Sequence, residues 1–231
     1  MWITFARLLT TQDAIIFLMS TRAIDVQTAR ELSPQELREV RRNNAEQIAY
    51  AVTKLLVLLQ DVKNKDFSKN EGIELITSDG VTSPGKIRLQ VERVVDREGD
   101  VYQINVGLRI AMDGHEVATR IWQAPLAPED YHGMHTLVIT SEMQCSSEGI
   151  GLGTGILATN DTILEAVITS QPEAFHRSPT VTAVITDNAT ALNRENNRDG
   201  WTANQAKLLG YTFAETDEFY KVFPTRPGTK A

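Results

Sequence analysis

The sequence HTLVITSEMQCSSEGIGLGTGIL, residues 135–157, decides the fold that the chain is expected to adopt. Its first part, residues 137–140, is apolar and β-branched, which is typical of a strand. After a polar bend, glycine stands at positions 149, 151, 153 and 155, and apolar residues then recur at near-helical spacing. A strand, a glycine-rich turn and a helix together point backbone N–H groups at an anion, usually a phosphate. This segment therefore predicts an anion-binding loop.

Two common nucleotide-binding loops fit these glycines poorly. A Rossmann fingerprint that starts at Gly149 or Gly151 lacks its third glycine. One that starts at Gly153 ends at Ala158, a permitted variant, but the acid expected roughly 20 residues further on is missing. A Walker A loop ends in Gly-Lys-Ser/Thr, and no lysine occurs between residues 86 and 207. The loop is therefore not predicted to bind a dinucleotide or a nucleoside triphosphate.

The order of the segments around the loop is a second signal. After the glycines come a helical stretch, a β-branched strand at 180–186, a helix at 201–209 that ends at Gly210-Tyr211, and a last strand over 212–222. From residue 137 onward, this order resembles the core of the GNAT-type N-acetyltransferases. In that family a strand leads into Arg/Gln-Gly-x-Gly-x-Gly/Ala and a helix. A later strand and helix end in Gly-Phe or a near equivalent, before a closing strand.

The resemblance implies a function and a set of site residues. The chain would move an acetyl or other acyl group from acyl-CoA to an amine, either a small molecule or a peptide, without a metal. In the family, a splay between the strand before the loop and the next strand admits the pantetheine arm. Glu142 is the candidate general base. The residues expected to bind acetyl-CoA or another acyl-CoA are Met143, Gln144, Gly149, Ile150, Gly151, Leu152, Gly153 and Thr154.

Two positions depart from the family pattern and leave an alternative open. Glu148 stands where the family has Arg or Gln, and Ala206 stands where a tyrosine often acts as general acid toward the leaving thiolate. Arg194 and Arg198 are candidates for the missing positive charge. The alternative is a non-catalytic structural or interaction module of the same fold that assembles through its N-terminal helix.

That helix is predicted from a capping box. Ser33-Pro34-Gln35-Glu36 begins it, and an apolar stripe from Leu37 to Leu59 extends it over residues 34–63. Such a length exceeds that of most globular helices. The helix therefore either breaks near 43–44 or packs against a partner chain, which would make a homodimer, although burial in the core also accounts for the stripe. Residues 11–19 are expected to be helical as well.

The middle of the chain predicts antiparallel strands. Residues 86–122 alternate apolar and polar side chains, with turns at 97–100 and 113–114. We therefore expect a helical N-terminal region, 1–70, followed by an α/β domain, 71–231. The domain contains the meander at 86–122, the CoA-loop unit at 135–168 and a strand–helix–strand unit at 180–223. Its sheet is expected to be mixed, mostly antiparallel and of the GNAT type.

Composition limits the partners. The net charge of −7 over 231 residues disfavours nucleic acid, which requires a basic face. The apolar runs at 14–19 and 52–59 are too short to span a bilayer, so no membrane is expected. Cys145 is the only cysteine, which favours a reducing, cytoplasmic compartment. Asp130, His132 and His135 lack the spacing of metal ligands.

Overall fold

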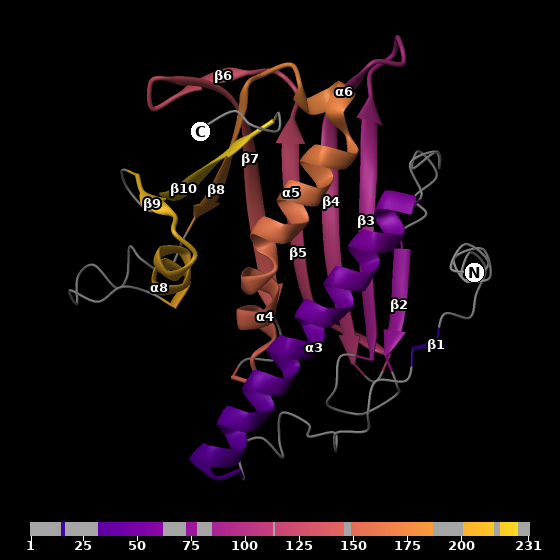
Figure 1. Cartoon of the computed structure of the whole chain (residues 1–231), viewed down its shortest axis with the longest axis vertical. Coiled ribbons are helices and arrows are strands. Elements are labelled where there is room, and N and C mark those ends of the chain that lie inside the picture. The colour runs from indigo at the N-terminus through magenta and orange to yellow at the C-terminus, as the bar shows by residue number, and fades with distance from the viewer. Residues whose placement is uncertain are drawn as a thin grey trace.

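The chain forms a mixed, mostly antiparallel open sheet with helices packed across one of its faces (Figure 1). The structure, a computed structural model, describes residues 15–16, 32–61, 73–77, 85–112, 114–145, 149–186, 201–214 and 218–225. Within these residues the sheet has ten strands in the order β1-β2-β3-β4-β5-β7-β8-β10-β9, and β6 pairs with β7 beside this path. The expected α/β class, the mixed and mostly antiparallel sheet and a helix in the N-terminal region are confirmed.

Three long strands form an antiparallel meander: β3 (Lys86–Val95), β4 (Val101–Met112) and β5 (His115–Pro125). Side chains alternate along them, so that one face of the sheet is apolar and buried while the other is largely polar. β5 extends beyond residue 122 because its last residues still pair with β4. The short strand β6 (Glu129–Tyr131) then makes a hairpin with β7.

The segment quoted first builds a parallel crossover. It forms β7 (Met134–Cys145) and, after the glycine loop, helix α4 (Leu152–Ala158). Helices α5 (Asn160–Ser170) and α6 (Pro172–Phe175) then lead to β8 (Thr180–Thr186), which is parallel to β7.

β7 pairs with β8 over only part of its own length. Their register runs from Leu137 opposite Val181 to Ser141 opposite Ile185. β7 continues to Cys145, and this last part pairs with β5. Figure 1 shows β8 turning away from β7 towards the end where α8 lies. The pairing therefore ends at Ser141 and Ile185, one residue before the end of β8, and β7 continues for four more residues; the predicted splay stays a prediction.

The C-terminal strand differs from the expectation. Helix α8 (Trp201–Leu208) is followed by two strands, β9 (Thr212–Phe213) and β10 (Glu218–Pro224), rather than one. β10 lies between β8 and β9 and is antiparallel to both, because the chain reverses after β9 and pairs along the whole of β8. Gly210, with φ at 78°, ends α8 in the left-handed conformation that favours glycine.

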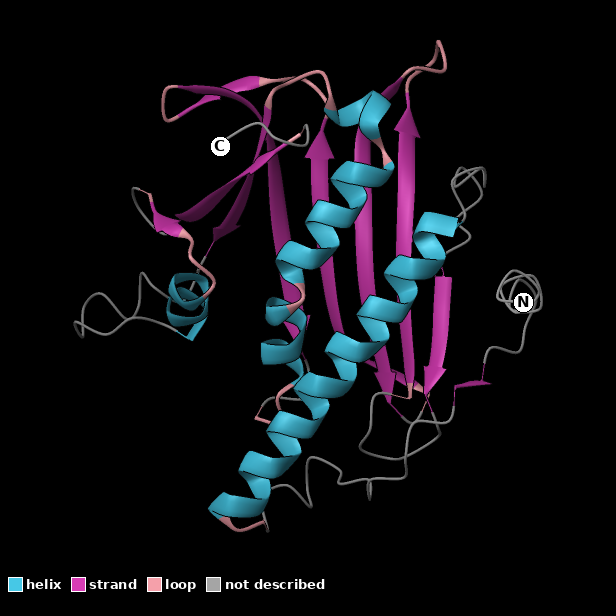
Figure 2. Cartoon of the chain, in the orientation of Figure 1, coloured by secondary structure: helices cyan, strands magenta, loops and turns pink. Residues whose placement is uncertain are grey.

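Helix α3 (Pro34–Asp61) runs diagonally over the sheet beside α4 and α5 (Figure 2). Its capping box forms as expected: the Ser33 N–H donates to the Glu36 carboxylate at 2.9 Å, and the Glu36 N–H donates to the Ser33 hydroxyl at 3.3 Å. The helix does not break at residues 43–44. The buried Asn44 amide donates to the Ile150 carbonyl at 2.9 Å, so it is satisfied without competing for its own helix backbone.

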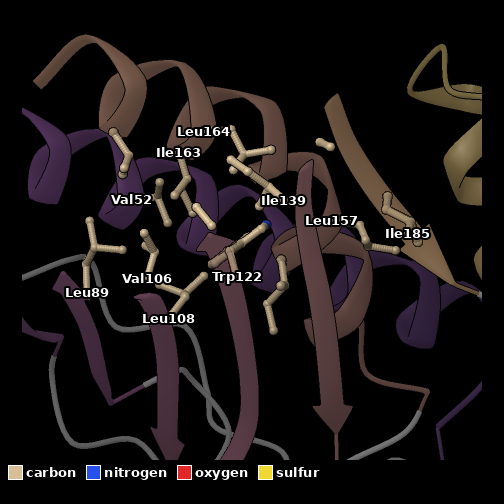
Figure 3. Packing of buried hydrophobic residues seen from close by; sticks show 14 of the residues in the cluster. Val52, Leu89, Val106, Leu108, Trp122, Ile139, Leu157, Ile163, Leu164 and Ile185 are labelled. Atoms are coloured by element: carbon tan, nitrogen blue, oxygen red, sulfur yellow. The ribbon is translucent and has the colours of Figure 1, made fainter. Parts of the chain in front are cut away.

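Residues of the apolar stripe of α3 pack in the hydrophobic core. Ile48, Val52 and Leu55 are buried in one core with the apolar face of the sheet and with α5. Figure 3 shows Val52 in this core together with Leu89 of the sheet and Ile163 of α5. A side chain at Gly155 of α4 would lie 2.8 Å from Cδ1 of Ile48, so the close packing of α3 on α4 requires glycine there. Burial in the core accounts for these three residues.

Two shorter strands extend the meander. β2 (Ile73–Thr77) is antiparallel to β3, and β1 (Ile15–Ile16) is parallel to β2. The expected helix at 11–19 is therefore wrong at residues 15–16, where two β-branched residues pair at the edge of the sheet instead. In the described part of the chain, no helix is both long and apolar enough to cross a membrane.

Candidate functional site

A cavity of about 630 Å³ lies where the glycine loop, the end of β7 and the start of α8 meet. Met143 and Cys145 of β7 line one side, Trp201 and Thr202 of α8 line another, and Arg41 of α3 lines a third. The glycine loop supplies the rest of the wall. Helix α3, strand β7, the glycine loop and helix α8, which are far apart in the sequence, thus line one cavity.

Six of the nine predicted site residues line this cavity: Met143, Gly149, Gly151, Leu152, Gly153 and Thr154. Ile150 is buried in the core instead. Glu142 and Gln144 are exposed on the opposite face of the sheet, because side chains alternate along a strand. The Gln144 amide donates to the Glu142 carboxylate at 3.0 Å. The candidate base therefore faces away from the cavity.

The loop owes its shape to glycines in the left-handed conformation. Gly149 has φ at 83° and Gly151 has φ at 89°. The first hydrogen bond of α4 runs from the Gly155 N–H to the Gly151 carbonyl at 3.0 Å. The N–H groups of Leu152, Gly153 and Thr154 therefore precede any acceptor within the helix and are available as donors at the cavity wall.

Arg41 supplies a positive charge that sequence reasoning missed. Its Nε donates to the Gly149 carbonyl at 2.5 Å, across 108 residues of sequence. Nothing in the sequence of α3 distinguishes Arg41 from its neighbours Arg38 and Arg42. The charges that the sequence did suggest, at Glu148, Arg194 and Arg198, lie outside the described residues.

Trp201 lies across the cavity from β7. Its side chain is 46% exposed, and its Cη2 atom lies 3.0 Å from the position that a Cβ on Gly153 would occupy. The indole ring therefore rests on the loop backbone, and only glycine at 153 leaves it room. An exposed tryptophan beside the glycine loop offers an apolar surface to a ligand.

Polar side chains in the interior of the fold form a hydrogen-bonded network. The indole N–H of buried Trp122 donates to Oδ1 of Asn160 at 2.8 Å, and the Asn160 amide donates to the Tyr211 hydroxyl at 2.5 Å. Tyr211 donates to Asp161, which also accepts from Lys221. Burial and the neighbouring Asp161 raise the pKa of Tyr211 well above its usual range, so its hydroxyl stays protonated.

Arg120 of β5 lies near this network, close enough for Tyr211 and Asp161 to act on its charge. Burial lowers the pKa of its guanidinium to about 10, against the effect of Tyr211 and Asp161, so it remains a cation at neutral pH. Its Cζ lies 5.2 Å from the centre of the Trp122 ring, within cation–π range.

No protein family, curated protein or solved structure matches the chain. The site must therefore be interpreted from its own geometry. Among the described residues no group of His, Cys, Asp and Glu could hold a metal ion. Asp130 and His135 approach to 3.4 Å across the β6–β7 pair, but both are exposed.

Proposed function

We propose that the protein is an acyl-CoA-dependent N-acyltransferase, as its resemblance to the GNAT-type enzymes implies. The observation that carries the proposal is the cavity, which combines loop N–H donors, a guanidinium and the end of β7. Beyond Ser141 no described strand pairs with the other edge of β7, which supports the same function, because the family opens its sheet there to admit the pantetheine arm. The sheet would then be of the GNAT type.

The residues of the cavity fit a CoA pyrophosphate. The N–H groups of Leu152, Gly153 and Thr154 offer donors without internal acceptors, and such groups suit phosphate oxygens. Arg41 would provide the positive charge that the family takes from the residue before its first glycine, and it comes from α3 instead. The pantetheine amides would pair with β7 beyond Ser141 in the manner of an added strand.

Acyl-CoA supplies an acyl group activated as a thioester. In the transfer, the amine nitrogen bonds to the acyl carbon, the C–S bond breaks, a base takes the ammonium proton and the thiolate takes up a proton. Glu142 is the candidate base on the open face of the sheet, from which the amine would approach.

Replacing Arg41→Gln is expected to weaken CoA binding about tenfold or more, because a charge-assisted hydrogen bond contributes about 1.5–3 kcal/mol. Isothermal titration of CoA at two salt concentrations measures the loss, which should shrink as salt screens the charge. Arg42→Gln is the matched control, since Arg42 is exposed and pairs with Glu46 at 3.9 Å. Wild-type protein that binds no CoA at millimolar concentration would end the proposal, and an unchanged affinity in Arg41→Gln would remove the role of Arg41.

Replacing Glu142→Gln is expected to lower kcat by about 10²–10⁴, the usual contribution of a general base, and to leave the affinity for CoA unchanged. The measurement is thiol release from acyl-CoA with an amine that supports turnover. Glu165→Gln, an exposed carboxylate on α5, is the control. Equal rates in wild type and Glu142→Gln would exclude this residue as the base.

One observation favours the non-catalytic alternative. Ala206, which stands where the family often has its tyrosine, is 0% exposed and packs in the core. A protein that binds CoA but releases no thiol with any amine would support a binding module of the same fold rather than an enzyme.

A further inference from the structure

A buried arginine stands where the pairing of β7 with β8 ends. Arg120 is 2% exposed, and its Nη2 donates to the Ser141 hydroxyl at 2.8 Å. Ser141 is the last β7 residue paired with β8, and its hydroxyl donates to the Val184 carbonyl at 3.3 Å. Arg120 is also the register partner of Met143, which lines the cavity. Directly opposed residues of antiparallel strands share a face, so Arg120 projects on the side of the cavity.

This cation has no direct counter-ion among the described residues. Its Nε is buried without any hydrogen-bond partner, and its Nη2 is bonded to a neutral hydroxyl. Asp161, the carboxylate that acts on it electrostatically, is occupied by Tyr211 and Lys221. Buried charges in proteins are normally paired, and a buried donor without a partner is costly. Among the described residues, the guanidinium of Arg120 is therefore not paired directly with a carboxylate.

We infer that Arg120 binds a carboxylate at the far end of the transferred acyl chain, so that the acyl donor is the CoA thioester of a dicarboxylic acid. The inference rests on the proposed function and specifies its substrate. Ser141 and Met143 lie two residues apart on β7, or about 7 Å along the strand. Were the thioester to lie beside Met143, an acetyl group would be too short to span this distance, whereas a succinyl or glutaryl chain would be long enough. The carboxylate takes no part in the transfer and stays ionised.

The guanidinium suits this role better than a general positive charge would. Nε–H and the remaining N–H groups of Arg120 form a planar fork that matches the two oxygens of a carboxylate. The Trp122 ring on one side and the Ser141 hydroxyl on the other hold the fork in one orientation. Binding the acyl carboxylate would satisfy the buried Nε and neutralise the charge in a single contact.

Isothermal titration of the full chain with CoA, acetyl-CoA and succinyl-CoA tests the inference. Wild type is expected to bind succinyl-CoA at least about tenfold more tightly than acetyl-CoA. Arg120→Met should abolish this preference while leaving the affinity for CoA itself unchanged. Arg109→Met is the control, because Arg109 is half-exposed and pairs with Glu116 at 3.5 Å. It should keep the preference.

Thermal unfolding gives a second readout. Arg120→Met should melt at the wild-type temperature or above it, since it removes an uncompensated buried charge. Succinyl-CoA should raise the melting temperature of wild type more than acetyl-CoA does. The two ligands should stabilise Arg120→Met equally. Arg120→Lys keeps the positive charge but lacks the planar guanidinium, so it should retain only part of the preference for succinyl-CoA. This variant replaces Arg120→Met in the test if Arg120→Met does not fold. Binding of CoA without any acyl preference would overturn this inference alone, whereas no binding of any CoA would overturn the proposed function with it.

Discussion

Replacing Gly151→Ala is expected to destabilise the protein by about 3–5 kcal/mol. A Cβ at this position would lie 2.5 Å from the carbonyl oxygen of Arg41 and 2.8 Å from its Cα, and these are backbone atoms that no rotamer change can move. The backbone at Gly151 has φ at 89°, which adds strain for any L side chain. The two costs act together, because avoiding the clash requires α3 to move away from the loop.

Urea unfolding of wild type and variant measures this loss. Gly107→Ala is the matched control, since a Cβ at Gly107 of β4 meets no atom within 4 Å and its φ is not positive. That change should be neutral or stabilise by about 0.5 kcal/mol, because alanine loses less backbone entropy on folding. If Gly151→Ala cost no more than Gly107→Ala, the packing of α3 against the loop would be incorrect.

The second large effect is expected at Trp122. This side chain is 1% exposed, lies in the centre of the core and donates its indole N–H to Asn160. Trp122→Ala should cost about 3–5 kcal/mol, through the cavity it leaves and the unpaired amide oxygen. Trp122→Phe retains part of the packing and should cost about 1–3 kcal/mol, mainly for the unpaired oxygen.

Trp201→Ala provides the control for the same residue type. Trp201 is 46% exposed, so its loss should change stability by less than about 1 kcal/mol. Its fluorescence should respond to CoA in the cavity, because its side chain lines the cavity wall. A stability loss at Trp201 as large as that at Trp122 would contradict the burial of the two rings.

Local patterns in the sequence determined much of the fold. The capping box at Ser33 and Glu36, the alternation through residues 86–122 and the glycines at 149–155 each depend on residues within one helical turn or one pleat. These signals do not require a partner elsewhere in the chain. For that reason the helix start, the meander and the loop could be expected before the structure was known, and six of the predicted residues line one cavity.

Only the tertiary structure decided which side chains complete the site. Arg41 meets Gly149 because α3 crosses the sheet diagonally and packs against the loop, and this crossing depends on the whole core. The buried Nε of Arg120 has no hydrogen-bond partner among the described residues, because Ser141 bonds to Nη2 and Asp161 is engaged by Tyr211 and Lys221. Periodicity specifies which face of an element is buried, but it does not specify the element against which that face packs. Contacts between distant segments are therefore set by packing, and local sequence cannot specify them.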